Sequence, residues 1–178
     1  MNQLSHLVTG TIAYLSMDVA IDSDIPTYSG GLGILAGDML RSAADLGVPM
    51  VAVTLLHRKG YFDQRLDARG NQLESPSKWS PENRLEPLPQ RVSIAIEGRN
   101  VSVRAWRYPF RGITGHAVPL LFLDTDLDDN DPRDRVLTDH LYGGDEHYRL
   151  CQESILGFGG LGNAAHAGIF KRPRLPHE

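Results

Sequence analysis

The residues best placed by type and spacing to do chemistry form the segment Ser29-Gly30-Gly31-Leu32-Gly33, which stands between a predicted strand and a predicted helix. A helix N-terminus exposes unpaired N–H groups and carries a partial positive charge. Glycines there allow an anion to approach the N–H groups closely. The segment therefore predicts a site for an anion or a sugar phosphate. A tight strand-to-helix turn capped by Ser29 or Gly30 is the equally weighted alternative.

The glycine segment matches neither of the two common nucleotide-binding patterns. The dinucleotide fingerprint is excluded because G-G-L-G has no third glycine at the required step. A Walker loop is excluded because it needs Gly-Lys-Ser or Gly-Lys-Thr. The anion prediction therefore rests on a helix N-terminus with glycines at its mouth, and not on a nucleotide motif.

Acidic residues and histidines raise the question of a metal site. Four acidic residues follow a predicted strand, namely Asp124, Asp126, Asp128 and Asp129. Their spacing fits no EF-hand loop, and a solvated strand end is the favoured interpretation. The seven histidines form no H-x-x-x-H pair, so zinc has no support. The sequence predicts no metal.

A strand, a helix and a second strand must position the glycine segment. Thr11–Val19 is rich in β-forming residues, and the short, wholly apolar segment Met50–Leu56 is typical of a buried parallel strand. Ile34–Leu46 between them predicts a helix. Its apolar residues recur at i, i+4 and i+8, at Leu35, Met39 and Ala43. We expect the two strands to be parallel neighbours with the helix packed across them.

The rest of the chain predicts further strands and helices. Arg91–Tyr108 favours two alternating strands joined at Glu97-Gly98-Arg99-Asn100, and Ala117–Leu127 favours another buried strand. The proline-rich segment Glu74–Gln90 is expected to be a connector, neither strand nor helix. Helices are predicted over two later segments, Arg133–Leu141 and Glu146–Leu156. The predicted fold class is α/β, a Rossmann-like parallel sheet with flanking helices and a β-hairpin insertion.

Composition narrows the classes of protein and partner. At 178 residues the chain suits one domain, and its net charge of −4 gives no reason to expect nucleic acid or a membrane surface as partner. The single cysteine, Cys151, excludes an internal disulfide framework and fits a cytoplasmic location. We find no signal peptide pattern and no apolar run long enough for a transmembrane helix.

The string YSGGLGILAGDMLRSAADLGVPMVAVTLLHRKGYFDQ, residues 28–64, closely resembles the α-glucan phosphorylases, in their shorter prokaryotic and archaeal branch. The resemblance extends from residue 11 to residue 160, through LFLDTDLDDNDPRDRVLTDHLYGGDEHYRLCQESILGFGG. It implies the N-terminal domain of a two-domain glycosyltransferase fold. It also implies cleavage of α-1,4-glucan by phosphate to give glucose 1-phosphate, with pyridoxal phosphate as cofactor. The site residues carried over are Gly30, Gly31, Leu32 and Gly33, and more weakly Ser29.

Other segments that match the family contribute weaker candidates. Their polar or aromatic residues are Arg58, Tyr61, Asp145, Arg149 and Gln152. For each of them a structural ion pair or helix cap is the favoured interpretation. His57 departs from the aromatic residue expected before Arg58 in the family.

The resemblance ends after Gly160, so we expect a partial phosphorylase domain at 1–160 and a divergent, out-of-frame or disordered tail at 161–178. Codons for His166–Ile169 and Pro176–Glu178, read one base later, can restore family-like residues. The family's second domain and its cofactor lysine are not matched, so the chain alone is expected to bind no pyridoxal phosphate and to be inactive. Two alternatives remain open: part of a synthase-type glycosyltransferase, and a non-catalytic glucan-binding module.

Overall fold

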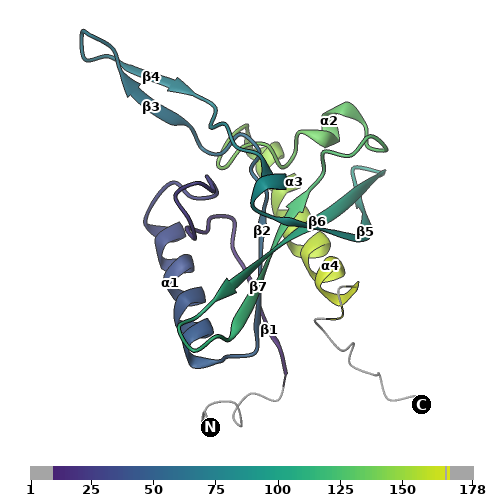
Figure 1. Ribbon diagram of the computed structural model, residues 1–178. Coiled ribbons are helices and arrows are strands. Elements are labelled where there is room, and N and C mark those ends of the chain that lie inside the picture. The colour runs from purple at the N-terminus through teal and green to yellow at the C-terminus, as the bar shows by residue number, and fades with distance from the viewer. Residues whose placement is uncertain (1–9, 167, 169–178) are drawn as a thin grey trace.

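Five strands form one sheet in the order β1-β2-β7-β6-β5, with helices on both faces (Figure 1). The computed structural model describes residues 10–166 and 168. The strand bounds are β1 Ile12–Leu15, β2 Met50–Leu55, β5 Glu86–Ile96, β6 Arg99–Arg111 and β7 Ala117–Asp124. The α/β class is therefore confirmed.

The first strand–helix–strand unit is confirmed. β1 and β2 are parallel neighbours, with Ile12 opposite Met50. Helix α1 (Gly31–Leu46) lies between them in the chain and packs over the sheet. β1 is shorter than predicted, because Val19 donates its N–H to the Thr27 carbonyl and Ala20 donates to the Gly33 carbonyl. The segment after Leu15 thus supports the glycine loop instead of extending the sheet.

Side chains of the central strands alternate between two apolar cores. On β2, Ala52 packs into the core under α1, whereas Val51, Val53 and Leu55 pack into the opposite core. The opposite core is covered by α3 (Glu146–Ser154), a π-helical turn η3 (Ile155–Gly159) and α4 (Gly160–His166). The continuous apolar sequence of β2 follows from this burial on both faces.

The prediction of a parallel sheet with a hairpin insertion is corrected to a mixed sheet. β1, β2 and β7 are parallel, but β6 pairs antiparallel with both β7 and β5. The predicted β5–β6 hairpin exists, with Glu97 and Gly98 at φ 50° and 76° in its turn. Such a turn matches the twist of the two strands. The hairpin extends the main sheet and is not an insertion beside it.

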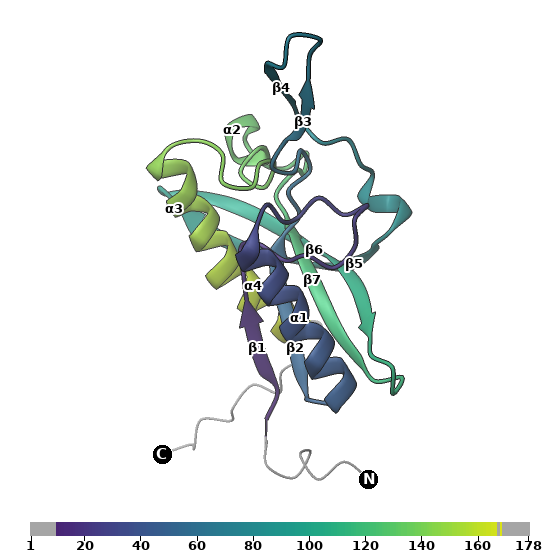
Figure 2. The same cartoon turned by 90° about the vertical axis from the view of Figure 1, so that its left-hand side faces the viewer.

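A second hairpin lies outside the prediction. β3 (Asp63–Leu66) and β4 (Gln72–Ser75) pair antiparallel and project from the body of the molecule (Figures 1 and 2). Every residue of both strands is exposed, so no apolar alternation marks them in the sequence. The Asp67 carboxylate accepts the N–H groups of Arg69 and Asn71, which fixes the turn.

The predicted connector at 74–90 is also wrong in part. β4 ends at Ser75, a short 3-10 helix η2 spans Pro81–Asn83, and β5 begins at Glu86. Pro87 lies at the irregular start of β5, where the register with β6 shifts between Pro87 and Arg91. The prolines are tolerated because β5 is an edge strand of the sheet.

The predicted helix at 133–141 is reduced to α2 (Pro132–Arg135). The residues after it pair with another segment, because the N–H groups of Arg58 and Lys59 donate to the carbonyls of Thr138 and Asp139. By contrast, the predicted helix at 146–156 is present and continues through η3 into α4. Tertiary pairing therefore decides where the first of these helices ends.

The apolar stripe predicted for α1 is wrong at Leu35 and Met39 and right at Ala43, which is buried. Leu35 and Met39 are 57% and 41% exposed. The buried face instead carries mostly small residues, namely Gly33, Ala36, Gly37, Leu40, Ala43 and Ala44. A Cβ at Gly37 would lie 1.9 Å from the Ala20 carbonyl oxygen, so the helix rests directly on the backbone there. Small residues, and not large apolar ones, make this contact possible.

The predicted division after Gly160 falls at the start of α4. Ala164 of α4 is fully buried in the core that also holds Val53 and Leu123. Residue 167 and residues 169–178, which make up most of the predicted tail, lie outside the described residues. The proposed reading-frame change therefore stays a prediction.

Within residues 10–166 and 168, no helix has both the length and the apolar character needed to cross a membrane.

Candidate functional site

The glycine loop forms the N-terminus of α1. Gly30 is the cap residue, with extended φ and ψ of −166° and −158°, and its position supplies no side-chain cap. The first turn carries no acidic residue. The cap position therefore supplies no side chain to the first N–H groups of the helix, although the Asp18 carboxylate lies against the N–H groups of Ser29 and Gly33 from inside the molecule. The N–H groups of Gly31 and Leu32 are the ones that an outside anion can approach.

The glycines of the loop face in two directions. A Cβ at Gly33 would lie 2.0 Å from Asp18 Oδ1 and 2.7 Å from Tyr28 Cβ, so Gly33 is required by packing within the chain. A Cβ at Gly30 or Gly31 would meet no atom within 4 Å. Neither of these two has a left-handed backbone either. The fold itself therefore gives no reason for glycine at 30 and 31, and both face open space.

Asp18 supports the loop from inside the molecule. Its side chain is 2% exposed, and its Oδ1 atom has no hydrogen-bond partner among the described residues. Oδ2 accepts a hydrogen bond from the Tyr142 hydroxyl at 3.3 Å. Burial raises the pKa of Asp18, although the nearby N–H groups of Ser29 and Gly33 and the Tyr142 hydroxyl oppose the rise. Sequence reasoning missed Asp18 because Tyr142 and Gly33 reach it only through the fold.

His57 lies beside the same segment and is also fully buried. Its Nε2 atom is 2.8 Å from the Met17 carbonyl oxygen, to which the neutral ring donates, and its Nδ1 has no partner in the described structure. Burial lowers the pKa of His57 to about 4, so the ring is neutral at pH 7. The histidine at this departure from the family pattern is thus a buried structural group.

Backbone strain collects under the loop. The non-glycine residues with a left-handed backbone are His57 at φ 47°, Glu97 at 50° and Tyr142 at 55° among those described. Glu97 belongs to the hairpin turn. The other two contact Met17 and Asp18, which lead into the glycine loop. Strained residues persist only where the surroundings fix them, and they gather at functional sites.

The weaker candidates mostly have structural partners. Arg58 Nη2 lies 2.6 Å from Asp124 Oδ2, and Asp145 caps α3 by accepting the Tyr148 N–H at 2.9 Å. Gln152 is buried and donates to two main-chain carbonyls. Arg149 is exposed on α3. Only Tyr61, which is 41% exposed, lines a hollow together with Ser29 of the loop.

The prediction of a solvated strand end after β7 is wrong for Asp124, whereas Asp128 and Asp129 are exposed as predicted. Asp124 is fully buried, and its carboxylate accepts hydrogen bonds from Arg58, Arg104 and the Trp106 indole. Burial opposes ionisation, but the two guanidinium groups and the indole N–H lower the pKa of Asp124 below its ordinary value. The other acids pair outside the core, Asp126 and Asp128 with Arg135 and Asp129 with Arg91. Among the described residues, no group of three could hold a metal.

The described residues do not fit pyridoxal phosphate. This cofactor is held through a Schiff base to a lysine. Lys59 Nζ is committed to an ion pair with Asp139 at 2.6 Å, and Lys78 lies in an open, exposed hollow at the foot of the β3–β4 hairpin. Neither belongs to the glycine loop, so the described part of the chain offers no lysine-centred cofactor site.

Comparison with known proteins identifies the family. No protein-family model matches the chain. Maltodextrin phosphorylase of Thermococcus litoralis is 40% identical over 157 residues, covering 84% of this chain. Glycogen phosphorylase of Mycobacterium tuberculosis is 44% identical over 162 residues, covering 87%. Glycogen phosphorylase of Aquifex aeolicus is 32% identical and covers 83%. The chain belongs to the α-glucan phosphorylase family.

The similarity concerns only a part of these proteins. The chain spans 18% of the length of the Thermococcus and Mycobacterium phosphorylases that it matches. An uncharacterised protein of Methanocaldococcus jannaschii is also similar, at 36% identity over 149 residues, and the chain covers 28% of it. This phosphorylase-family chain therefore corresponds to a minor share of the full-length enzymes.

Proposed function

We propose that this chain supplies the phosphate-facing and glucose-facing loop of an α-glucan phosphorylase, at Gly30, Gly31, Leu32 and Gly33, with Ser29 at its edge. The observation that carries the proposal is the start of α1, where the cap residue offers no side chain and Gly30 and Gly31 face open space without a structural need for glycine. The likeness to glycogen and maltodextrin phosphorylases supports it.

The reaction would be phosphorolysis of the terminal α-1,4 bond of a glucan. The bond between the anomeric carbon and the glycosidic oxygen breaks, an oxygen of hydrogen phosphate bonds to that carbon, and the glycosidic oxygen takes the proton that the phosphate gives up. The N–H groups of the loop would stabilise the negative charge of the phosphate as the bond breaks. Pyridoxal phosphate and the facing half of the two-domain glycosyltransferase fold would come from outside the described residues.

Further support for the proposal comes from the side chains that fix the segment leading into the glycine loop. Asp18, His57 and Tyr142 hold the segment under the loop by hydrogen bonds, and His57 and Tyr142 do so at a cost in backbone strain. Such a framework keeps the N–H groups fixed before the ligand arrives, and fixed donors are what charge stabilisation requires.

The proposal is tested by measuring the affinity of the purified chain for inorganic phosphate, by calorimetry, before and after Gly31→Ala. The new methyl group meets no atom of the chain, so the fold should be unchanged. It would nevertheless occupy the space that the phosphate approaches. We expect the dissociation constant to rise about tenfold, the loss of one hydrogen bond to a charged group. Gly157→Ala is the matched control, because its Cβ also meets nothing and it lies in η3.

Equal phosphate affinity in the parent chain and both variants would contradict the assignment of the loop. A requirement for nucleoside diphosphate in place of phosphate would favour the synthase-type alternative. Binding of glucan without any binding of phosphate would favour the non-catalytic module.

A further inference from the structure

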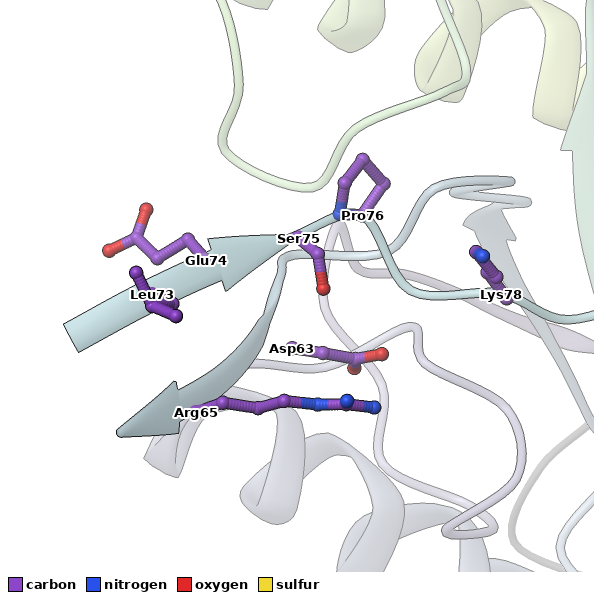
Figure 3. Close-up of a pocket in the computed structure, with 7 residues that line it drawn as sticks. All are labelled: Asp63, Arg65, Leu73, Glu74, Ser75, Pro76 and Lys78. Carbon is purple, nitrogen blue, oxygen red and sulfur yellow. The ribbon is translucent and has the colours of Figure 1, made fainter. Parts of the chain in front are cut away.

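A groove begins at the glycine loop and runs toward the projecting hairpin. Its first part is a hollow lined by Tyr28, Ser29, Tyr61 and Phe62, among others. Its second part is a hollow lined by Asp63, Arg65, Glu74 and Lys78, among others (Figure 3). Asp63 lines both hollows, which makes them adjoining parts of one surface. We call this surface the aromatic groove.

The framework of the aromatic groove is tied to the loop by close packing. The Ser77 N–H donates to the Lys59 carbonyl at 3.0 Å, and the Ser77 hydroxyl donates to Asp63 Oδ1 at 2.8 Å. Gly60 has φ 61°, and a Cβ there would lie 3.0 Å from Ser77 and 3.1 Å from Pro26. The three segments that form the groove walls are thereby held against one another, beside Ser29.

The lining has the chemistry of a sugar-binding surface. The Tyr61 and Phe62 rings are 4.2 Å apart and tilted by 34°, and Tyr61 is 41% exposed. Phe62 is half-buried and supports the exposed Tyr61 ring, which offers a flat apolar face on which the C–H face of a pyranose can lie. Hydroxyl, amide and carboxylate groups stand next to them, from Ser23, Ser29, Asp63 and Gln64. They provide donors and acceptors for sugar hydroxyls.

The charged side chains at the hairpin end of the groove do not favour a charged ligand, because both signs of charge are present. Arg65 and Lys78 are balanced by Asp63 and Glu74 in the same hollow. The side chains of Asp63 and Arg65 extend in the same direction from β3, toward the segment that carries Lys78 (Figure 3). A neutral polyhydroxyl ligand can bond to both signs of charge. Leu73 is the one aliphatic side chain other than proline in the lining, which disfavours an apolar peptide.

We infer that the aromatic groove binds the α-1,4-glucan chain, with Tyr61 as its central contact and the non-reducing end directed at the glycine loop. This inference rests on the proposed function, because the loop is where the terminal glucose would react. The groove extends past one hollow into the next, so a longer glucan makes contacts that a disaccharide cannot reach. Tyr61 thereby acts as a binding residue for glucan length and not as a catalytic residue.

The test is a pair of titrations of the whole chain with ¹⁵N-labelled backbone, one with maltoheptaose and one with inorganic phosphate. Maltoheptaose should shift the amide signals of Ser29, Tyr61, Phe62 and Ser77 and should bind more tightly than maltose. Tyr61→Ala should weaken maltoheptaose binding about tenfold, whereas Tyr61→Phe should retain most of it, because the ring is kept. Phe158→Ala removes a more exposed ring, 74% exposed, on η3 outside the groove, and should change nothing.

The two proposals fail in different ways. If phosphate shifts the amides of the glycine loop but maltoheptaose leaves the groove amides unchanged at saturating concentration, the groove assignment is overturned and the proposed function stands. Shifts by maltoheptaose that survive Tyr61→Ala unchanged would also overturn it. If phosphate shifts no loop amide while maltoheptaose shifts the groove, the proposed function fails and the groove remains a glucan site.

Discussion

Single residues under the glycine loop carry the clearest physical consequences. Asp18 and His57 are buried, and each has one polar atom without a hydrogen-bond partner in the described structure. Unsatisfied buried polar atoms cost stability, and a chain retains them where they serve another purpose. Here both side chains hold the segment that leads into the loop. We infer that the stability lost through the unsatisfied atoms is offset by a loop backbone that is fixed in position.

Acid should destabilise the chain through His57. Its pKa is lowered to about 4 by burial, whereas in the unfolded chain it is about 6.5. As the pH falls below 6.5, His57 becomes protonated in the unfolded state but stays neutral in the folded state. The free energy of unfolding therefore decreases until about pH 4, where the folded state is protonated as well. The full effect is about 3 kcal/mol. It is measured by urea unfolding at pH values from 7 to 4.

His57→Asn should flatten this pH dependence, because asparagine does not titrate and tolerates a left-handed backbone. His116→Asn is the control, since His116 is exposed on the surface and should leave the slope as in the parent chain. An unchanged slope in His57→Asn would show that other groups cause the acid sensitivity.

At the scale of elements, the buried carboxylate of Asp124 joins β6, β7 and the connection between β2 and β3. It lies at the end of β7 and binds Arg104 and Trp106 of β6 and Arg58 of the β2–β3 connection. The cluster fixes the position of the connection that continues to Tyr61 and the aromatic groove. A carboxylate that seemed to be a solvated strand end is thus the point where three parts of the fold are joined.

Arg58→Ala should therefore be strongly destabilising. It removes one partner from a buried charge, which costs about 3–5 kcal/mol where no other partner replaces it, and somewhat less here because Arg104 remains. Arg91→Ala removes an exposed pair with Asp129 and should cost about 0–1 kcal/mol. Urea unfolding of both variants checks the difference. Equal losses would contradict the role of the Asp124 cluster.

The sequence was sufficient for elements whose pattern is local. The apolar run of β2 and the turn at Glu97–Gly98 are both present where the sequence predicts them. It failed where tertiary contact decides. The helix predicted to Leu141 ends at Arg135 because Thr138 and Asp139 pair with Arg58 and Lys59. The exposed β3–β4 hairpin has no apolar alternation to reveal it.

The candidate site was predictable only in its outline. The glycine loop could be located because it combines a local glycine pattern with a strand and a helix on either side. Asp18, His57 and Tyr142 could not be assigned to it, since residues 18 and 142 are brought together by the fold alone. Likewise, the sequence could not distinguish Gly33, which packs on Asp18, from Gly30 and Gly31, which face open space.

At the scale of the whole molecule, the chain matches only a part of the length of its phosphorylase relatives. It spans 18% of the length of the Thermococcus litoralis and Mycobacterium tuberculosis phosphorylases. We expect the purified chain to bind no pyridoxal phosphate and to release no glucose 1-phosphate from maltodextrin and phosphate. The described lysines offer no cofactor site, which is the physical reason. Cofactor absorbance bound to the chain, with phosphorolysis lost on its removal, would contradict this expectation.

The central claim is that the N-terminus of α1 binds phosphate through its backbone, and amide-resolved NMR tests it most directly. Inorganic phosphate is titrated into the ¹⁵N-labelled chain, and the amide signals of the whole backbone are followed. The account predicts that the largest shifts fall on Gly30, Gly31, Leu32 and Gly33, with a common saturation curve. Saturating phosphate that leaves these four amides unmoved, or moves only distant surface residues, would contradict it.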